Sequence, residues 1–327
     1  MGYVLGVDGG STKTIALVAD RRGVVVGSGR AGGSNIYVPR PDMALAAVEQ
    51  AATAALDAAG VGPSDLDVGV FSMSGADWPE DIDFIRSEMA RRRLGRAVVV
   101  VNDAIGGLRA GSPDGNGIVV VCGTGTAVGA RAPDGQVWHT SFWQEPGGSE
   151  ELGRKTLRAA YRADLGVDPP TGLTPHILAF FGLSSIEAVL HAFTARLGTP
   201  PTTVAGLTRV LLDEAERGDA TARRVILEHG DALGDYALAA ARRVGIEATP
   251  FTLVLAGGVL RHPSRLLADA LVARARASSP GVRAVNSRFE PAVGALLLAL
   301  EAAGARIDES LLERLTTTLP PSQLYLT

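Results

Sequence analysis

Short apolar runs separated by glycine turns fill the first part of the chain. The runs at residues 3–7, 14–19 and 24–27 are rich in β-prone side chains, and the links between them contain Asp8-Gly9-Gly10 and Arg22-Gly23. Links this tight join neighbouring antiparallel strands. The sequence therefore predicts three antiparallel strands at the start of the chain.

A helical period then replaces the strand pattern. Segments 42–59 and 79–92 predict helices, segments 67–73 and 97–101 predict strands, and a further helix is expected from Asp103 onward. The apolar strand segments show little polar alternation, which is typical of strands covered by helices on both faces. The predicted order of this half is βββαβαβα.

The same order returns in the second half. Strands are expected at 117–121, 127–131, 136–140, 251–255 and 282–285, and helices at 220–244, 264–277 and 291–303, with a mostly helical insertion over about 148–217. Such self-similarity indicates two copies of one α/β unit. We expect lobes at residues 1–108 and 109–290 with a cleft between them, and a helix at about 291–304 that packs back on the first lobe.

Composition narrows the class of protein. A chain of 327 residues is long for one hydrophobic core and suits two. The net charge of −4 gives no basic excess for nucleic acid, so no nucleic-acid partner is expected. The single cysteine, Cys122, excludes an intramolecular disulfide and a four-cysteine metal site. We expect a cytoplasmic protein without a membrane span, because neither a signal-peptide pattern nor a long uncharged apolar run is present.

The candidate chemistry lies where predicted strands end, since ligands of open α/β sheets bind beyond the carboxyl ends of strands. The first strand ends in DGGSTKT and its counterpart in the second half ends in CGTGT. Backbone N–H groups, hydroxyls and a lysine in two such turns suit the phosphate chain of ATP. Either turn alone could be an ordinary hairpin, and their recurrence favours the nucleotide. The residues are Gly9, Gly10, Ser11, Thr12, Lys13, Gly123, Thr124, Gly125 and Thr126.

Two aspartates have both a structural and a chemical interpretation. Asp8 offers the hard oxygen ligand that Mg²⁺ prefers, or it is a turn residue. Asp103 is suited to cap the helix that it opens. At the mouth of a cleft, it is equally suited to accept a proton from a substrate hydroxyl.

Other motifs do not meet their structural conditions. The run from Gly27 to Gly32 matches G-x-G-x-x-G, but Asn35 and prolines follow it instead of a helix, so a dinucleotide site is not indicated. The chain contains neither a P-loop nor a hydrolase G-x-S-x-G. Trp78 falls in a predicted loop, where both core packing and sugar stacking remain open.

A wider set of motifs carries a resemblance. DGGSTKT, CGTGT and LAGGV, with the duplicated unit, resemble the actin-like ATPase superfamily of sugar kinases and heat-shock ATPases. AGGSN, SGAD, Asn102-Asp103, ELGR and EPAVGALLLA resemble its N-acetylglucosamine kinase branch, the BadF-type ATPase family. The resemblance spans nearly the whole chain. It implies a duplicated ribonuclease H-like fold.

The resemblance also implies roles for single residues. Asp8 manages Mg²⁺, Thr12 and Lys13 meet the terminal phosphates of ATP, Gly257 and Gly258 lie against adenosine, and Asp103 is the catalytic base. The implied sugar contacts are Ser34, Asn35, Asp77, Asn102, Asp103 and Glu145. Glu145 falls nearest the acid of a Gly-Asp-Glu-Gly-Ser stretch that the family usually has, and the rest of that stretch differs here. This departure concerns the identity of the sugar more than the phosphoryl transfer.

The expected activity is ATP-dependent phosphorylation of an amino sugar, such as N-acetylglucosamine or glucosamine, at a hydroxyl that the resemblance places on C6. A homodimer is also implied by the resemblance. The alternative is an ATPase that acts as a conformational activator or switch of a partner protein. Related activators hold an iron–sulfur cluster on cysteines, and the single cysteine here argues against that role.

Overall fold

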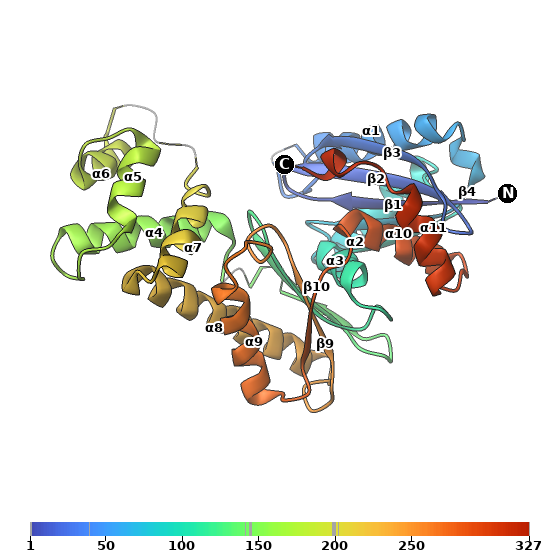
Figure 1. Cartoon of the computed structure of the whole chain (residues 1–327). Helices are drawn as coiled ribbons and strands as arrows, with labels where there is room; N and C mark the ends of the chain where they lie inside the picture. Colours follow the sequence, from blue (N-terminus) through green and yellow to red (C-terminus); the bar gives the residue numbers. More distant parts are fainter. Residues whose placement is uncertain are drawn as a thin grey trace. The chain divides into compact units, whose positions relative to one another are not determined.

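The computed structural model describes residues 2–326 except Pro39, Ser141, Gln144, Glu145, residues 198–200 and Thr202. The chain forms two compact units (Figure 1). Unit 1 comprises Met1–Val119, Gly129–Phe142 and Ser287–Thr327, and unit 2 comprises Val120–Val128 and Trp143–Asn286. The chain therefore leaves and re-enters unit 1, and its C-terminal segment belongs with its N-terminal strands.

A five-stranded mixed sheet forms the centre of unit 1. Its order is β3-β2-β1-β4-β5, with β1, β2 and β3 antiparallel and with β4 parallel to both β1 and β5. The strands are β1 (Tyr3–Gly9), β2 (Lys13–Asp20), β3 (Val25–Gly32), β4 (Leu66–Met73) and β5 (Ala97–Asn102). The three antiparallel strands predicted from the glycine turns are confirmed.

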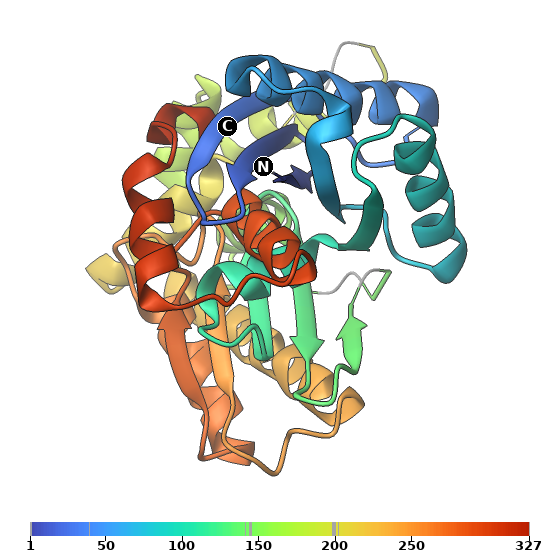
Figure 2. The same cartoon turned by 90° about the vertical axis from the view of Figure 1, so that its right-hand side faces the viewer.

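Helices cover both faces of this sheet (Figure 2). Leu5 and Val7 face the core shared with α1 (Pro41–Ala59) and α2 (Pro79–Arg91). Val4 faces the opposite core. That core is shared with α10 (Pro291–Ala302) and α11 (Glu309–Thr318), and α3 (Asp103–Gly111) packs on α10. Because residues on both sides of a strand are buried, its sequence shows no polar alternation.

A second five-stranded sheet repeats the first. Its order is β10-β9-β6-β7-β8, which matches the first sheet strand for strand. The strands are β6 (Gly117–Cys122), β7 (Thr126–Arg131), β8 (Val137–His139), β9 (Thr252–Ala256) and β10 (Arg283–Asn286). The duplicated α/β fold predicted from the sequence is confirmed.

Unit 2 also contains helices. They are α4 (Ser149–Asp164), α5 (Leu173–Phe181), α6 (Ile186–Thr194), α7 (Leu207–Arg217), α8 (Ala220–Arg243) and α9 (Leu266–Ser278). Two 3₁₀ helices, Pro63–Asp65 and Ser322–Tyr325, complete the described structure. Within the described residues no single helix is long and apolar enough to cross a membrane, although the bent pair α5 and α6 passes that test jointly by length and composition.

Strand β3 runs five residues beyond its predicted end at Gly27 and contains the whole glycine run. Its glycines allow α1 to lie directly on the strand. A Cβ atom on Gly27 would lie 2.1 Å from the carbonyl oxygen of Ala55, and one on Gly29 would lie 2.1 Å from that of Ala51. The G-x-G-x-x-G match therefore serves helix packing, and none of the described residues 33–38 is helical, as expected.

Replacing Gly29 with alanine tests this contact. We expect Gly29→Ala to lower the free energy of unfolding by about 1–3 kcal/mol, because the added methyl group must push α1 away from the sheet. Gly32→Ala in the same strand is the matched control, since no atom lies within 4 Å of its Cβ position. Urea unfolding of both variants is the measurement, and equal stabilities would contradict the close approach.

Candidate functional site

The loops after β1, β3 and β4 in unit 1 are joined by backbone hydrogen bonds. The N–H of Ser34 donates to the carbonyl oxygen of Gly10 at 2.9 Å, and the N–H of Ser74 donates to that of Gly9 at 2.7 Å. Within the first turn, the N–H of Gly10 donates to the carbonyl oxygen of Lys13 at 2.9 Å. Three segments far apart in the sequence therefore meet at one edge of the sheet.

Polar side chains extend this network. The Asn35 amide lies within hydrogen-bond distance of the Ser74 hydroxyl, at 3.2 Å, and of the Ser11 hydroxyl, at 3.3 Å. The hydroxyl of Thr14 donates to that of the buried Ser34 at 2.8 Å. Ser74 and Thr14 were not among the predicted site residues, although Ser74 belongs to the SGAD motif. The arrangement places an amide and several hydroxyls beside the first glycine turn.

Asn102 organises the end of β5. Its side-chain oxygen accepts the N–H of Ala104 at 3.1 Å, and its amide nitrogen donates to the Asp77 carboxylate at 2.8 Å. Asn102 is therefore the N-cap of α3, and Asp103 is the first residue of the helix. The interpretation of Asp103 as the cap is wrong by one position.

Asp8 and Asp103 share an environment that disfavours their charged forms. Burial, then the charges of Asp103 and Glu290, raise the pKa of Asp8 to about 7, while the charge of Lys13 opposes the shift. Burial and the charge of Asp77 raise the pKa of Asp103 to about 6, against the lowering effect of backbone N–H groups at the start of α3. The two carboxylates are thus close enough to repel one another.

Lys13 is held by the C-terminal segment of the chain. Its ammonium group donates a hydrogen bond to the carbonyl oxygen of Tyr325. Arg30, on the neighbouring strand, donates to the carbonyl oxygen of Leu324 at 3.1 Å. No role for this segment could be read from the sequence, and the structure places it beside the lysine of the first turn.

An aromatic cluster adjoins the same loops. The ring of Trp78 stacks on that of Phe142 with centroids 5.7 Å apart, and Tyr37 meets Phe142 edge-on at 5.2 Å. About half of the Trp78 surface is exposed, so core packing does not account for it. The backbone N–H of Tyr37 donates to the side-chain oxygen of Asn35 at 2.9 Å, which ties the cluster to the polar network.

The second glycine turn, residues 123–126 in unit 2, is braced on its carbonyl side. The N–H of Ser149, at the start of α4, donates to the carbonyl oxygen of Gly123 at 2.8 Å. Gly148 lies so close that a Cβ atom there would be 2.3 Å from the carbonyl oxygen of Gly125. Thr124 and Gly125 themselves are exposed. The carbonyl groups of the turn are therefore held by Gly148 and Ser149, whereas Thr124 and Gly125 are accessible to a ligand.

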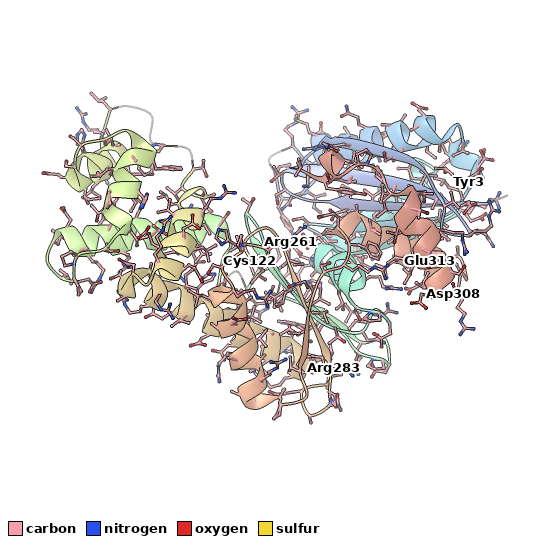
Figure 3. The ribbon with its side chains drawn as sticks, viewed as in Figure 1. Tyr3, Cys122, Arg261, Arg283, Asp308 and Glu313 are labelled. Atoms are coloured by element: carbon pink, nitrogen blue, oxygen red, sulfur yellow. The ribbon has the colours of Figure 1, made fainter. Side chains whose placement is uncertain are left out.

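The Gly257-Gly258 turn lies against the same strand end. Gly257 has φ of 91°, and a Cβ atom there would be 2.3 Å from the carbonyl oxygen of Cys122, so only glycine suits the position. The N–H of Val259 donates to that oxygen at 3.0 Å. Figure 3 labels Cys122 and Arg261, which mark the end of β6 and the segment after this turn. Cys122 is buried, and burial raises the pKa of its thiol to about 12, so the thiol stays protonated and packs in the core.

The predicted site residues thus form two groups, one in each unit. Unit 1 brings together Asp8, Gly9, Gly10, Ser11, Thr12, Lys13, Ser34, Asn35, Asp77, Asn102 and Asp103. Unit 2 brings together Gly123, Thr124, Gly125, Thr126, Gly257 and Gly258. Glu145 lies outside the described residues.

The donor chemistry at Asp8 fits a magnesium ion. Mg²⁺ is typically bound by one or two protein carboxylates together with substrate phosphates and water. Asp8 supplies one such carboxylate, and a cation beside it would relieve the repulsion with Asp103. Among the described residues, no cluster of three or more His, Cys, Asp or Glu side chains is arranged to hold a metal ion.

Comparison with models of known protein families identifies the family of the chain. Residues 5–299 match the model of the BadF/BadG/BcrA/BcrD ATPase family. The chain belongs to this family. The family resemblance inferred from the motifs is therefore confirmed, and the match covers both sheets of this BadF-family protein.

Relatives within reach of sequence comparison are named as amino-sugar kinases. An N-acetylmuramic acid/N-acetylglucosamine kinase of Clostridium acetobutylicum is 25% identical over 303 residues, which cover 91% of this chain and 98% of the relative. An N-acetyl-D-glucosamine kinase of Dictyostelium discoideum is 26% identical over 311 residues, which cover 90% of this chain and 97% of the relative.

Solved structures support the fold of this BadF-family protein. A structure from Chromobacterium violaceum aligns with a TM-score of 0.63 at 24% identity, over 91% of this chain and 99% of its own. A ROK family glucokinase from Streptomyces griseus, solved with glucose and AMPPNP, aligns with a TM-score of 0.58 at 18% identity, over 92% of this chain and its full length. At these identities the likeness shows the duplicated fold alone.

Removing the charge of Asp8 should stabilise the ligand-free BadF-family protein. Because the pKa of Asp8 is about 7 in the folded state and 3.8 is its ordinary value, the folded state binds more protons between these values, and stability falls as pH rises through them. We expect Asp8→Asn to raise the free energy of unfolding at pH 7.5 by about 1–3 kcal/mol, with a smaller gain at pH 5.

Thermal unfolding without nucleotide measures this effect. Asp57→Asn, at an exposed position on α1, is the control and should change little at either pH. An Asp8→Asn variant no more stable than the wild type at pH 7.5 would show that the carboxylate is not strained.

Proposed function

We propose that the protein transfers the terminal phosphate of ATP to a hydroxyl, on C6, of an amino sugar such as N-acetylglucosamine or glucosamine. Membership of an ATPase family supports ATP as the donor. The names of two relatives that match nearly end to end support the amino sugar as the acceptor. The geometry around Asp103 is the observation that carries the proposal.

Asp103 is the proposed catalytic base. Asn102 caps α3 in its place, so the Asp103 carboxylate is not committed to the capping position. A pKa of about 6 leaves it ionised at neutral pH and still basic enough to take a proton. As the sugar oxygen bonds to the γ-phosphorus, Asp103 accepts the hydroxyl proton, and the bond between that phosphorus and the bridging oxygen of ADP breaks. Positioning of the two reactants supplies much of the rate.

The polar network of unit 1 is the proposed sugar site. Asn35, Asp77 and Asn102 offer an amide, a carboxylate and a second amide that suit sugar hydroxyls, and Ser34 supports the loop that carries Asn35. The half-exposed ring of Trp78 offers an apolar face to a sugar ring. In this proposal Glu145 also contacts the sugar.

The glycine turns are the proposed nucleotide site. Gly9, Gly10, Ser11, Thr12 and Lys13 serve one part of the phosphate chain, and the turn at residues 123–126 serves another. Gly257 and Gly258 lie against adenosine. Asp8 would hold Mg²⁺, directly or through water, and the ion supplies positive charge to the phosphates when bound. The homodimer implied by the resemblance and the cytoplasmic location expected from the sequence stay predictions, and size-exclusion chromatography tests the first of them.

Sugar-dependent release of ADP tests the function. Purified protein with ATP and Mg²⁺ is assayed against neutral hexoses, amino sugars and N-acetyl amino sugars. We expect turnover to depend on an amino sugar. ATP hydrolysis at the same rate with every sugar, or with none, would overturn the proposal and favour the alternative of an ATPase that switches a partner protein.

Asp103→Asn tests the base. We expect turnover to fall by about 10²–10⁴, because the amide cannot accept the hydroxyl proton. Affinity for ATP should stay within about twofold, since the substitution leaves the glycine turns unchanged. Steady-state kinetics and ATP titration measure both, with Asp57→Asn as the control. Near-normal turnover in Asp103→Asn would remove Asp103 from its role.

A further inference from the structure

Four residues behind the second glycine turn form a closed ring of polar contacts. The Lys155 ammonium lies 2.8 Å from the Glu151 carboxylate and 3.0 Å from Nδ1 of His229. Nε2 of His229 lies 3.0 Å from the carbonyl oxygen of Gly147, and the N–H of Gly147 donates to the Glu151 carboxylate. The ring thus links α4 and α8 through the peptide groups of Gly147.

The chemistry of the ring fixes the state of the histidine. An ammonium group only donates, so Nδ1 of His229 must be the acceptor and Nε2 must carry the proton. Nε2 then donates to the carbonyl oxygen of Gly147, which only accepts. Burial and the charge of Lys155 lower the pKa of His229 to about 4, consistent with a neutral ring. His229 is fully buried. A substitution that removes its ring therefore leaves the Gly147 carbonyl oxygen and the Lys155 ammonium without this hydrogen-bond partner.

The ring acts on the segment that braces the turn at residues 123–126. Gly147 is followed by Gly148, which lies against the carbonyl groups of Gly123 and Gly125, and by Ser149, whose N–H bonds to Gly123. Both polar groups of the Gly147 backbone are held within the ring. A shift of Gly147 would therefore be passed to the turn through two residues.

The identity of the cation is informative. The chain contains only two lysines, and arginine supplies the other 29 of its 31 basic residues. One of the two lysines, Lys155, occupies this ring. A compact ammonium can contact a carboxylate and a ring nitrogen at once, whereas the planar guanidinium of arginine has a fixed fork of donors on a longer side chain. Arginine is therefore a poor replacement here.

We propose that His229 is a positioning residue for nucleotide binding: with Lys155 and Glu151 it fixes Gly147, and through Gly147 the glycine turn that holds ATP phosphates. This inference rests on the proposed function only in naming ATP as the ligand of the turn. It assigns a role to a residue on α8 that no motif in the sequence indicated.

The test separates positioning from stability. His229→Ala, His229→Gln and Lys155→Arg are compared with Leu233→Ala, which removes a buried side chain four residues further along α8 and outside the ring. Affinities for ATP and ADP are measured by calorimetry without sugar. Michaelis constants for ATP and for the sugar, and thermal unfolding midpoints, are measured in parallel.

We expect His229→Ala to weaken nucleotide affinity by about tenfold, because the turn loses its fixed geometry. The Michaelis constant for ATP should rise by a similar factor. The Michaelis constant for the sugar should not change. His229→Gln, whose amide can donate to Gly147, should retain part of the affinity that His229→Ala loses. Lys155→Arg should also weaken nucleotide affinity, because the guanidinium cannot keep both contacts of the ammonium group. Leu233→Ala should lower the unfolding midpoint with nucleotide affinity retained.

Two outcomes would overturn the inference. One is unchanged nucleotide affinity in folded His229→Ala protein, and the other is an equal loss of affinity in Leu233→Ala. Absence of sugar-dependent turnover in the wild type would instead contradict the proposed function, while the nucleotide titrations would still decide the role of His229.

Discussion

The carbonyl groups of Gly9 and Gly10 accept the N–H groups of Ser74 and Ser34, and these two hydrogen bonds set the geometry of unit 1 around its candidate site. Backbone groups cannot be moved by a change of rotamer, so the loops after three strands keep one spacing. The polar side chains of those loops then fall within hydrogen-bond distance of one another without long flexible arms. Short side chains, such as those of serine, asparagine and aspartate, are therefore sufficient to form these hydrogen bonds.

Unit 2 uses the same device on the equivalent strand. There the carbonyl groups of Cys122 and Gly123 accept the N–H groups of Val259 and Ser149. Both copies of the α/β unit thus join the turn after their first strand to neighbouring loops through its carbonyl oxygens. The repetition concerns backbone bonding, which does not depend on the identity of the side chains at these positions.

Much of the fold could be predicted because its strands are apolar on both faces and end at glycine turns. The end of β3 could not, since Gly29 and Gly32 have low strand propensity and only the approach of α1 explains Gly29. Asn102 and Asp103 are both good capping residues, and the sequence cannot tell which of two adjacent positions caps. His229 gave no signal at all, because a lone histidine on a helix acquires meaning only when Lys155 and Gly147 are brought to it.

The contact between Lys13 and the carbonyl oxygen of Tyr325 has a practical side. A purification tag or fluorescent reporter fused after the final residue would disturb the segment whose carbonyl group accepts the hydrogen bond of this lysine. Binding constants measured on such a fusion would then include an effect of the tag itself. A cleavable tag at the other end of the chain avoids this artefact.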